Sequence, residues 1–235
     1  MFEAILFDLD GTLLNIDMEI FLQHYFRKMH EMARESGYHE AGRLVEQVFK
    51  STGVMIANLD PGFSNEAIFM QDFLTNCQYP EDEMRGFFDE FYESAFPGLH
   101  QYCQPFPGIP EMMQKLMDRG MKVVIATNAV FPLTALHQRL DWAGLGNFKF
   151  DLITSYEVMH FCKPHTDYYQ EITEQIGVNP AKCLMVGNDV GEDLPAGQIG
   201  MKTFLVEDML IDKADGIKPD QRGRLSDLFT FLDSL

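Results

Sequence analysis

Short apolar runs recur along the chain, and each ends at polar or turn-forming residues. Runs of this kind are typical of buried strands. They predict five strands, over 4–7, 122–126, 152–154, 183–186 and 202–206. Between the later runs, apolar residues recur at helical spacing and predict helices over 109–119, 132–143, 165–176 and 192–199. Strands that alternate with helices favour an α/β fold with a parallel sheet flanked by helices.

The region 16–102 has a different pattern, because its apolar residues recur only at helical spacing. Phe21, Tyr25 and Met29 form one such stripe. Proline and glycine at 97–98 and 105–108 predict turns where the chain leaves this region. We therefore expect a core of residues 1–15 and 103–235, with an all-helical domain of residues 16–102 inserted after the first strand.

The composition fits a folded, acidic protein. Its 235 residues are 46% hydrophobic, enough to bury a substantial core. The net charge of -18 disfavours binding to nucleic acid or to an anionic membrane, since both need clustered Lys and Arg. The start of the chain lacks a signal-peptide pattern, and no apolar run is long enough to span a membrane. We therefore expect a cytoplasmic protein with neither a nucleic-acid nor a membrane partner.

The first predicted strand ends in two acids, Asp8 and Asp10, which are followed by Gly11. Paired carboxylates repel each other and cost desolvation energy unless a cation or a shared proton relieves them. The pair therefore indicates a hard metal ion, a carboxylate nucleophile, or both. On its own it is equally typical of a strand followed by an acidic turn.

Two further predicted strands end in polar residues. Thr127 and Asn128 follow the second strand, and Asn188 and Asp189 follow the fourth. In an open parallel sheet, ligands bind at the carboxyl ends of the strands. We therefore expect these side chains to meet the first acids in one crevice.

Lys163 and Asp193 complete the candidate set. Lys163 stands in a loop before a predicted helix, with Pro164 expected at the first helical position. Asp193 follows Asp189 by about one helical turn. If the helix has begun at Asp189, both acids lie on one face.

In this order, Asp8-x-Asp10, Thr127, Lys163 and Asp189-x-x-x-Asp193 resemble the four motifs of the haloacid dehalogenase superfamily. The resemblance covers the chain before and after the insertion. It implies a Rossmann-like sheet and a helical cap of the type found in phosphoglycolate phosphatase-like and β-phosphoglucomutase-like members. It also implies dependence on Mg²⁺ and an aspartyl-phosphate intermediate.

Each residue suits a step of phosphoryl transfer. Asp8 would be the nucleophile, and Asp10 the general acid and base. Lys163 would neutralise charge on the nucleophile and the phosphoryl group. The remaining assignments place Asp8, the main-chain carbonyl of Asp10 and Asp189 on Mg²⁺, place Thr127, Asn128 and Lys163 on phosphate oxygens, and give Asn188 and Asp193 supporting roles.

An acid at position 10 favours phosphoryl transfer over dehalogenation, because halide leaves without a proton. We therefore expect a Mg²⁺-dependent phosphatase that acts on a small phosphorylated metabolite. The alternatives are a phosphomutase acting on a sugar phosphate and a non-catalytic protein that binds a phosphate ligand. The sequence leaves open the substrate and the choice between monomer and dimer. The insertion would supply specificity, with candidates at Asn15, Asp17, Glu19, Gln23 and His24, although His24 also fits a packed core histidine.

Overall fold

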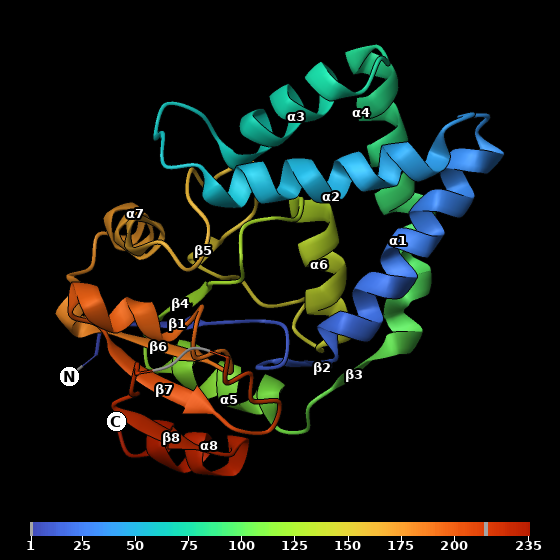
Figure 1. Cartoon of the computed structure of the whole chain (residues 1–235). Coiled ribbons are helices and arrows are strands. Elements are labelled where there is room, and N and C mark those ends of the chain that lie inside the picture. The colour runs from blue at the N-terminus through green and yellow to red at the C-terminus, as the bar shows by residue number, and fades with distance from the viewer. Residues whose placement is uncertain (1, 214–215) are drawn as a thin grey trace.

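A six-stranded, fully parallel sheet forms the centre of the protein in the computed structural model, which describes residues 2–213 and 216–235 (Figure 1). The strand order is β5-β4-β1-β6-β7-β8. The strands are β1 (Ala4–Phe7), β4 (Lys122–Ile125), β5 (Leu152–Ile153), β6 (Cys183–Gly187), β7 (Lys202–Val206) and β8 (Gln221–Gly223). The predicted α/β fold and its five strands are confirmed. The edge strand β8 was not predicted, because Gln-Arg-Gly has no apolar run.

The two faces of the sheet pack against different helices, since successive side chains of a strand point to opposite faces. Ile5 and Phe7 of β1 belong to a core that includes side chains of α5 (Ile109–Asp118), α6 (Leu133–Trp142) and α8 (Leu225–Asp233). Ala4 and Leu6 belong to a second core with α7 (Thr166–Ile176). The central strand β1 is therefore buried on both faces.

The chain between β1 and α5 is helical and begins and ends in a short antiparallel pair, β2 (Leu14–Ile16) with β3 (Cys103–Pro105). We call the part between these strands the helical segment. It comprises α1 (Met18–Glu35), α2 (Ala41–Ala57), α3 (Asn65–Asn76), α4 (Glu81–Glu90), a π-helical turn (Phe91–Ala95) and a 3-10 helix (Phe96–Tyr102). Figure 1 shows α1 to α4 gathered on one side of the sheet, with α6 between α2 and the strands. The expected domain boundaries, 16–102 for the cap and the remainder for the core, stay a prediction.

Two local predictions are wrong. A 3-10 helix over Leu194–Ile199 replaces the helix expected over 192–199, because Pro195 lacks the N–H that an α-helix requires. Pro164 is not the first helical residue: α7 begins at Thr166, and the Lys163–Pro164 peptide bond is cis.

Within residues 2–213 and 216–235, no helix is both long and apolar enough to cross a membrane.

Candidate functional site

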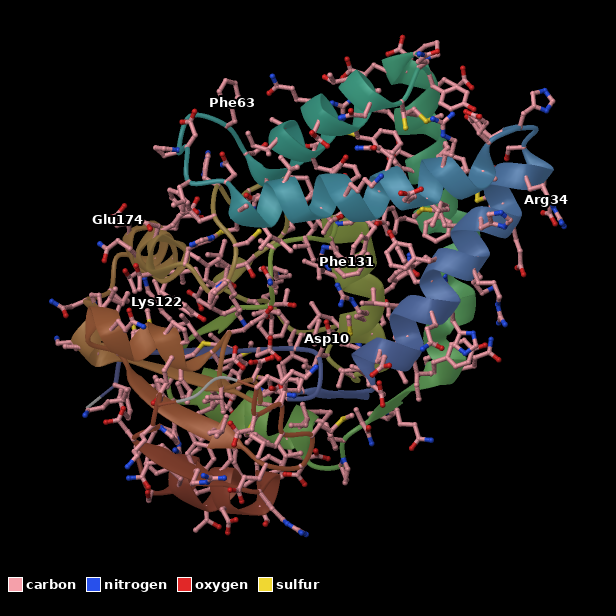
Figure 2. All side chains as sticks on the ribbon, in the orientation of Figure 1. Asp10, Arg34, Phe63, Lys122, Phe131 and Glu174 are labelled. Carbon is pink, nitrogen blue, oxygen red and sulfur yellow. The ribbon has the colours of Figure 1, made fainter. Side chains whose placement is uncertain are left out.

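A cavity of about 390 Å³ lies between the carboxyl ends of the central strands and the helical segment. The predicted site residues that line it are Asp8, Asp10, Thr127, Asn128, Asn188, Asp189 and Asp193. Lys163 is buried and reaches the same site through its ion pairs. The structure therefore brings together the predicted catalytic, phosphate-binding and metal-binding residues, whereas their individual roles stay predictions. Figure 2 shows Asp10 and Phe131, another lining residue, near the middle of the molecule below α2.

The position of the cavity follows from the order of the strands. The chain runs from β1 to β4 and β5 on one side, then crosses to β6 and β7 on the other. Such a reversal opens a crevice at the carboxyl ends of the two strands between which it occurs, here β1 and β6. Asp8 follows β1, and its N–H donates to the carbonyl of Val186 in β6 at 2.8 Å. Asp8 and the residues after β6 therefore meet at this crevice.

Gly11 allows the turn after β1 to pass close to Asn188. Its φ of +84° is rare for other residues, and a Cβ at this position would lie 2.3 Å from Asn188 Nδ2. The close approach also places the Thr12 hydroxyl 3.2 Å from Asp8 Oδ2 and 3.2 Å from Asn188 Oδ1. Thr12, which the sequence did not single out, thus links the first acid to the end of β6.

Lys163 joins two buried acids. Its Nζ donates to Asp8 Oδ1 at 2.8 Å and to Asp193 Oδ1 at 2.6 Å. Asp193 Oδ2 accepts the N–H of Asp189 at 2.9 Å, and Gly187 leaves room for this carboxylate, because a Cβ there would lie 2.1 Å from Asp193 Oδ2. Burial alone would lower the pKa of Lys163, but Asp193 and Asp8 outweigh it and hold the pKa well above its ordinary value. Lys163 is therefore a fixed positive charge beside Asp8.

Burial raises the pKa of Asp8 to about 8. Lys163 opposes this rise, whereas the neighbouring acids Asp193 and Asp10 add to it. Protein groups alone therefore do not offset the cost of burying an ionised Asp8 carboxylate. A further cation in contact with Asp8 would favour the ionised form.

Asp10 pairs with Arg139, a residue of α6 that the sequence analysis missed. The Arg139 side chain is 0% exposed, its Nη1 donates to Asp10 Oδ2, and its guanidinium lies 4.3 Å from the centroid of the Phe131 ring. In the described structure, Asp10 Oδ1 and the Nε and Nη2 atoms of Arg139 have no protein partner. Arg139 follows the buried Ala135 and Leu136 at helical spacing. A cation on an apolar helix face indicates a buried ion pair, and this is the feature of the sequence that points to Arg139.

Asn128 connects the loop after β4 to the rest of the site. Its Oδ1 accepts the N–H of Lys163 at 3.2 Å, and its Nδ2 donates to Glu192 Oε1 at 3.2 Å. Because α6 begins only at Leu133, Asn128 lies in the turn before this helix and not at its N-terminus. Glu192, which sequence reasoning also missed, lines the cavity, and burial raises its pKa to about 7.

The residues present fit a divalent cation. Five acidic side chains line the cavity (Asp8, Asp10, Asp189, Glu192 and Asp193), whereas two cations, Lys163 and Arg139, pair with them. Among the described His, Cys, Asp and Glu side chains, no three converge as a metal cluster. The predicted shell, however, needs only two carboxylates besides a main-chain carbonyl, and Mg²⁺ usually keeps several waters. The excess of carboxylates over cations favours an added cation.

The residues expected to set specificity are not in the cavity. Asn15, Asp17, Glu19, Gln23 and His24 are all absent from its lining. Asp17 instead caps α1 by accepting the N–H groups of Glu19 and Ile20, and the His24 ring stacks on Tyr102 with centroids 3.7 Å apart. The α1 residues that do line the cavity are Met18, Leu22, Tyr25 and Phe26, so the helix turns apolar and aromatic side chains toward it.

Comparisons with known proteins agree with this architecture. A family model described as haloacid dehalogenase-like hydrolase matches residues 2–199. The putative pyrophosphatase PpaX of Clostridium perfringens is 27% identical over 86% of this chain and 83% of its own, and the phosphoglycolate phosphatase of Aquifex aeolicus is 27% identical over 98% and 97%.

Solved structures share the fold. A HAD phosphatase from Thermococcus onnurineus superposes with a TM-score of 0.59 at 19% identity, covering 98% of this chain and 97% of its own. The L-2-haloacid dehalogenase of Xanthobacter autotrophicus superposes with a TM-score of 0.58 at 16% identity over the whole of both chains. With the family model matched over most of its length and the motif residues gathered at one sheet edge, this chain belongs to the haloacid dehalogenase-like hydrolases.

Proposed function

We propose that this protein is a Mg²⁺-dependent phosphatase that hydrolyses a small phosphorylated metabolite through a phosphorylated Asp8. One observation carries the proposal: Asp8, at the end of the central strand, accepts a hydrogen bond from Lys163 and lines the same cavity as Asp10. This pairs a carboxylate nucleophile with a fixed cation and a second carboxyl group for proton transfer. The phosphatase names of the relatives support the same reaction class.

In the proposed first step, an Asp8 oxygen attacks phosphorus, and the bond between phosphorus and the leaving oxygen breaks. Asp10 gives a proton to that oxygen; its Oδ1 is the atom available, because Oδ2 is held by Arg139. In the second step, Asp10 takes a proton from a water molecule that attacks phosphorus and releases Asp8 and inorganic phosphate. Because the bond between phosphorus and the Asp8 oxygen breaks in this step, Asp8 is again a free carboxylate.

The charge on the phosphoryl oxygens would be balanced by the groups around Asp8. Lys163 supplies a fixed positive charge, and Thr127 and Asn128 supply hydrogen-bond donors. The Thr127 carbonyl is itself held by the hydroxyls of Tyr168 and Thr154, both at 2.7 Å, which fixes this loop. Mg²⁺, held by Asp8, the Asp10 carbonyl and Asp189, would add further positive charge at the phosphoryl group when bound.

The test is hydrolysis of an aryl phosphate by the purified protein with Mg²⁺ and without any bisphosphate activator. We expect release of inorganic phosphate by the parent protein and a loss of at least about 10³-fold in the Asp8→Asn variant. Circular dichroism would verify that this variant is folded. Activity within about tenfold of the parent would overturn the role of Asp8, and turnover that requires a bisphosphate would indicate the phosphomutase instead.

A further inference from the structure

The half of the cavity that faces the helical segment is apolar. Its lining from this segment comprises Met18, Leu22, Tyr25 and Phe26 of α1 with Val48, Phe49, Thr52 and Ile56 of α2. Val130, Phe131 and Ile211 extend the apolar surface on the core side. Phe49 is 67% exposed although it lines the cavity, so this part of the lining is open to solvent. The cavity thus has an acidic end at the strands and an apolar end below the helices.

No positive charge faces the apolar end. Among the described residues that line the cavity, none is Lys, Arg or His. Two cations lie nearby, and each is in an ion pair, Lys163 with Asp8 and Asp193, and Arg139 with Asp10. Within the described residues, Arg139 keeps two nitrogen atoms without a protein partner, but its side chain is 0% exposed, lies against Phe131 and does not line the cavity.

The polar groups of the apolar end are also occupied. The Tyr25 hydroxyl is hydrogen-bonded to the Tyr92 hydroxyl at 2.8 Å, and the Thr52 hydroxyl donates to the carbonyl of Val48 at 2.8 Å. A second phosphate or a carboxylate placed against the buried Tyr25 and Val48 would lose hydration and gain no cation in return, which is unfavourable. An apolar group placed there would gain the hydrophobic free energy of leaving water.

We propose that the substrate is a phosphate monoester of an uncharged, largely apolar alcohol or phenol, with its organic group held between α1, α2 and Phe131. This inference rests on the proposed phosphatase function and specifies its substrate class. Substrates with a second anionic group next to the phosphate are excluded by the same lining. The cavity volume is near the lower end for small-ligand sites, which suits a phosphoryl group attached to one ring or a short chain.

The test compares phenyl phosphate with 4-carboxyphenyl phosphate, which share the ring and differ by one negative charge. We expect kcat/KM for phenyl phosphate to be at least about tenfold higher, because the added carboxylate meets no cation. Among straight-chain alkyl phosphates, we expect kcat/KM to rise about fourfold for each added CH₂ until the cavity is full.

Two variants of α2 distinguish an effect of the cavity lining from a general effect of an added positive charge. Thr52→Lys places a cation in the apolar end and should reverse the preference between the two aryl esters. Val54→Lys adds the same charge on the same helix at an exposed position outside the lining, and should leave the preference as in the parent. Hydrolysis of the carboxylated ester or of pyrophosphate by the parent as fast as, or faster than, phenyl phosphate would overturn the substrate class while the phosphatase function stands. If neither aryl ester, no alkyl phosphate and no pyrophosphate is hydrolysed, the phosphatase function fails and this inference falls with it.

Discussion

The ion pair between Arg139 and Asp10 gives the sharpest test of the site's construction. Arg139→Met removes the guanidinium but keeps an unbranched side chain in the same space. The Asp10 carboxylate then lies in a largely buried position without its cation, and Phe131 loses its cationic neighbour. Breaking a buried pair by removing one partner costs about 3–5 kcal/mol, so we expect the free energy of unfolding to fall by about that amount. This is a large part of the roughly 5–15 kcal/mol that stabilises a typical domain.

The assay is urea unfolding in EDTA, so that metal binding does not contribute. Arg85→Met is the matched control, because Arg85 pairs with Glu66 and Glu81 but its side chain is 43% exposed. That variant should lose no more than about 1 kcal/mol. Adding Asp10→Asn to Arg139→Met should recover part of the loss, because it removes the uncompensated charge. A loss for Arg139→Met as small as that for Arg85→Met would refute the buried ion pair.

Three further predictions concern the metal, the contact between the helical segment and the core, and the cysteines. Mg²⁺ at a hundred times its Kd should raise the free energy of unfolding by about 2.7 kcal/mol. In a thermal unfolding assay, Asp189→Asn should abolish this gain, and an undiminished gain would exclude Asp189 as a ligand. Asn65→Leu should cost about 1–3 kcal/mol in urea unfolding, because Asn65 Nδ2 donates to the carbonyls of Ala129 and Phe161; a loss too small to measure would contradict that contact. Burial raises the pKa of both Cys103 and Cys162 to about 12, so at pH 8 their thiols should react with Ellman's reagent only after denaturation; rapid labelling of the native protein would show the burial to be wrong.

The strands and acids of the site could be predicted because the signal for each is local. Buried parallel strands require continuous apolar runs, and polar residues directly after them must emerge at the ligand-binding edge. Asp8, Thr127 and Asp189 were found in this way, and the structure places all three around one cavity. The edge strand β8 and the pair of β2 with β3 could not be predicted, because strands of three residues have too few positions to show a hydrophobic pattern.

The missed residues act through contacts that span the chain. Arg139 reaches Asp10 across 129 positions, and Asn65 reaches Phe161 across 96. No local spacing encodes such a pair, although a cation on an apolar helix face indicates that it must find a partner. The specificity candidates lie outside the cavity lining. His24 and its neighbours lie near the hinge, whereas the cavity is lined by apolar and aromatic side chains of α1.

The central claim is that Asp8 itself carries the phosphoryl group during turnover. The most direct measurement mixes the enzyme and Mg²⁺ with a ³²P-labelled phosphate monoester and quenches with acid within the first turnover. We expect a hydroxylamine-labile label on the peptide that contains Asp8, and none on the Asp8→Asn protein. Phosphate release from the parent with no labelled protein at any quench time, or with the label on another residue, would contradict it.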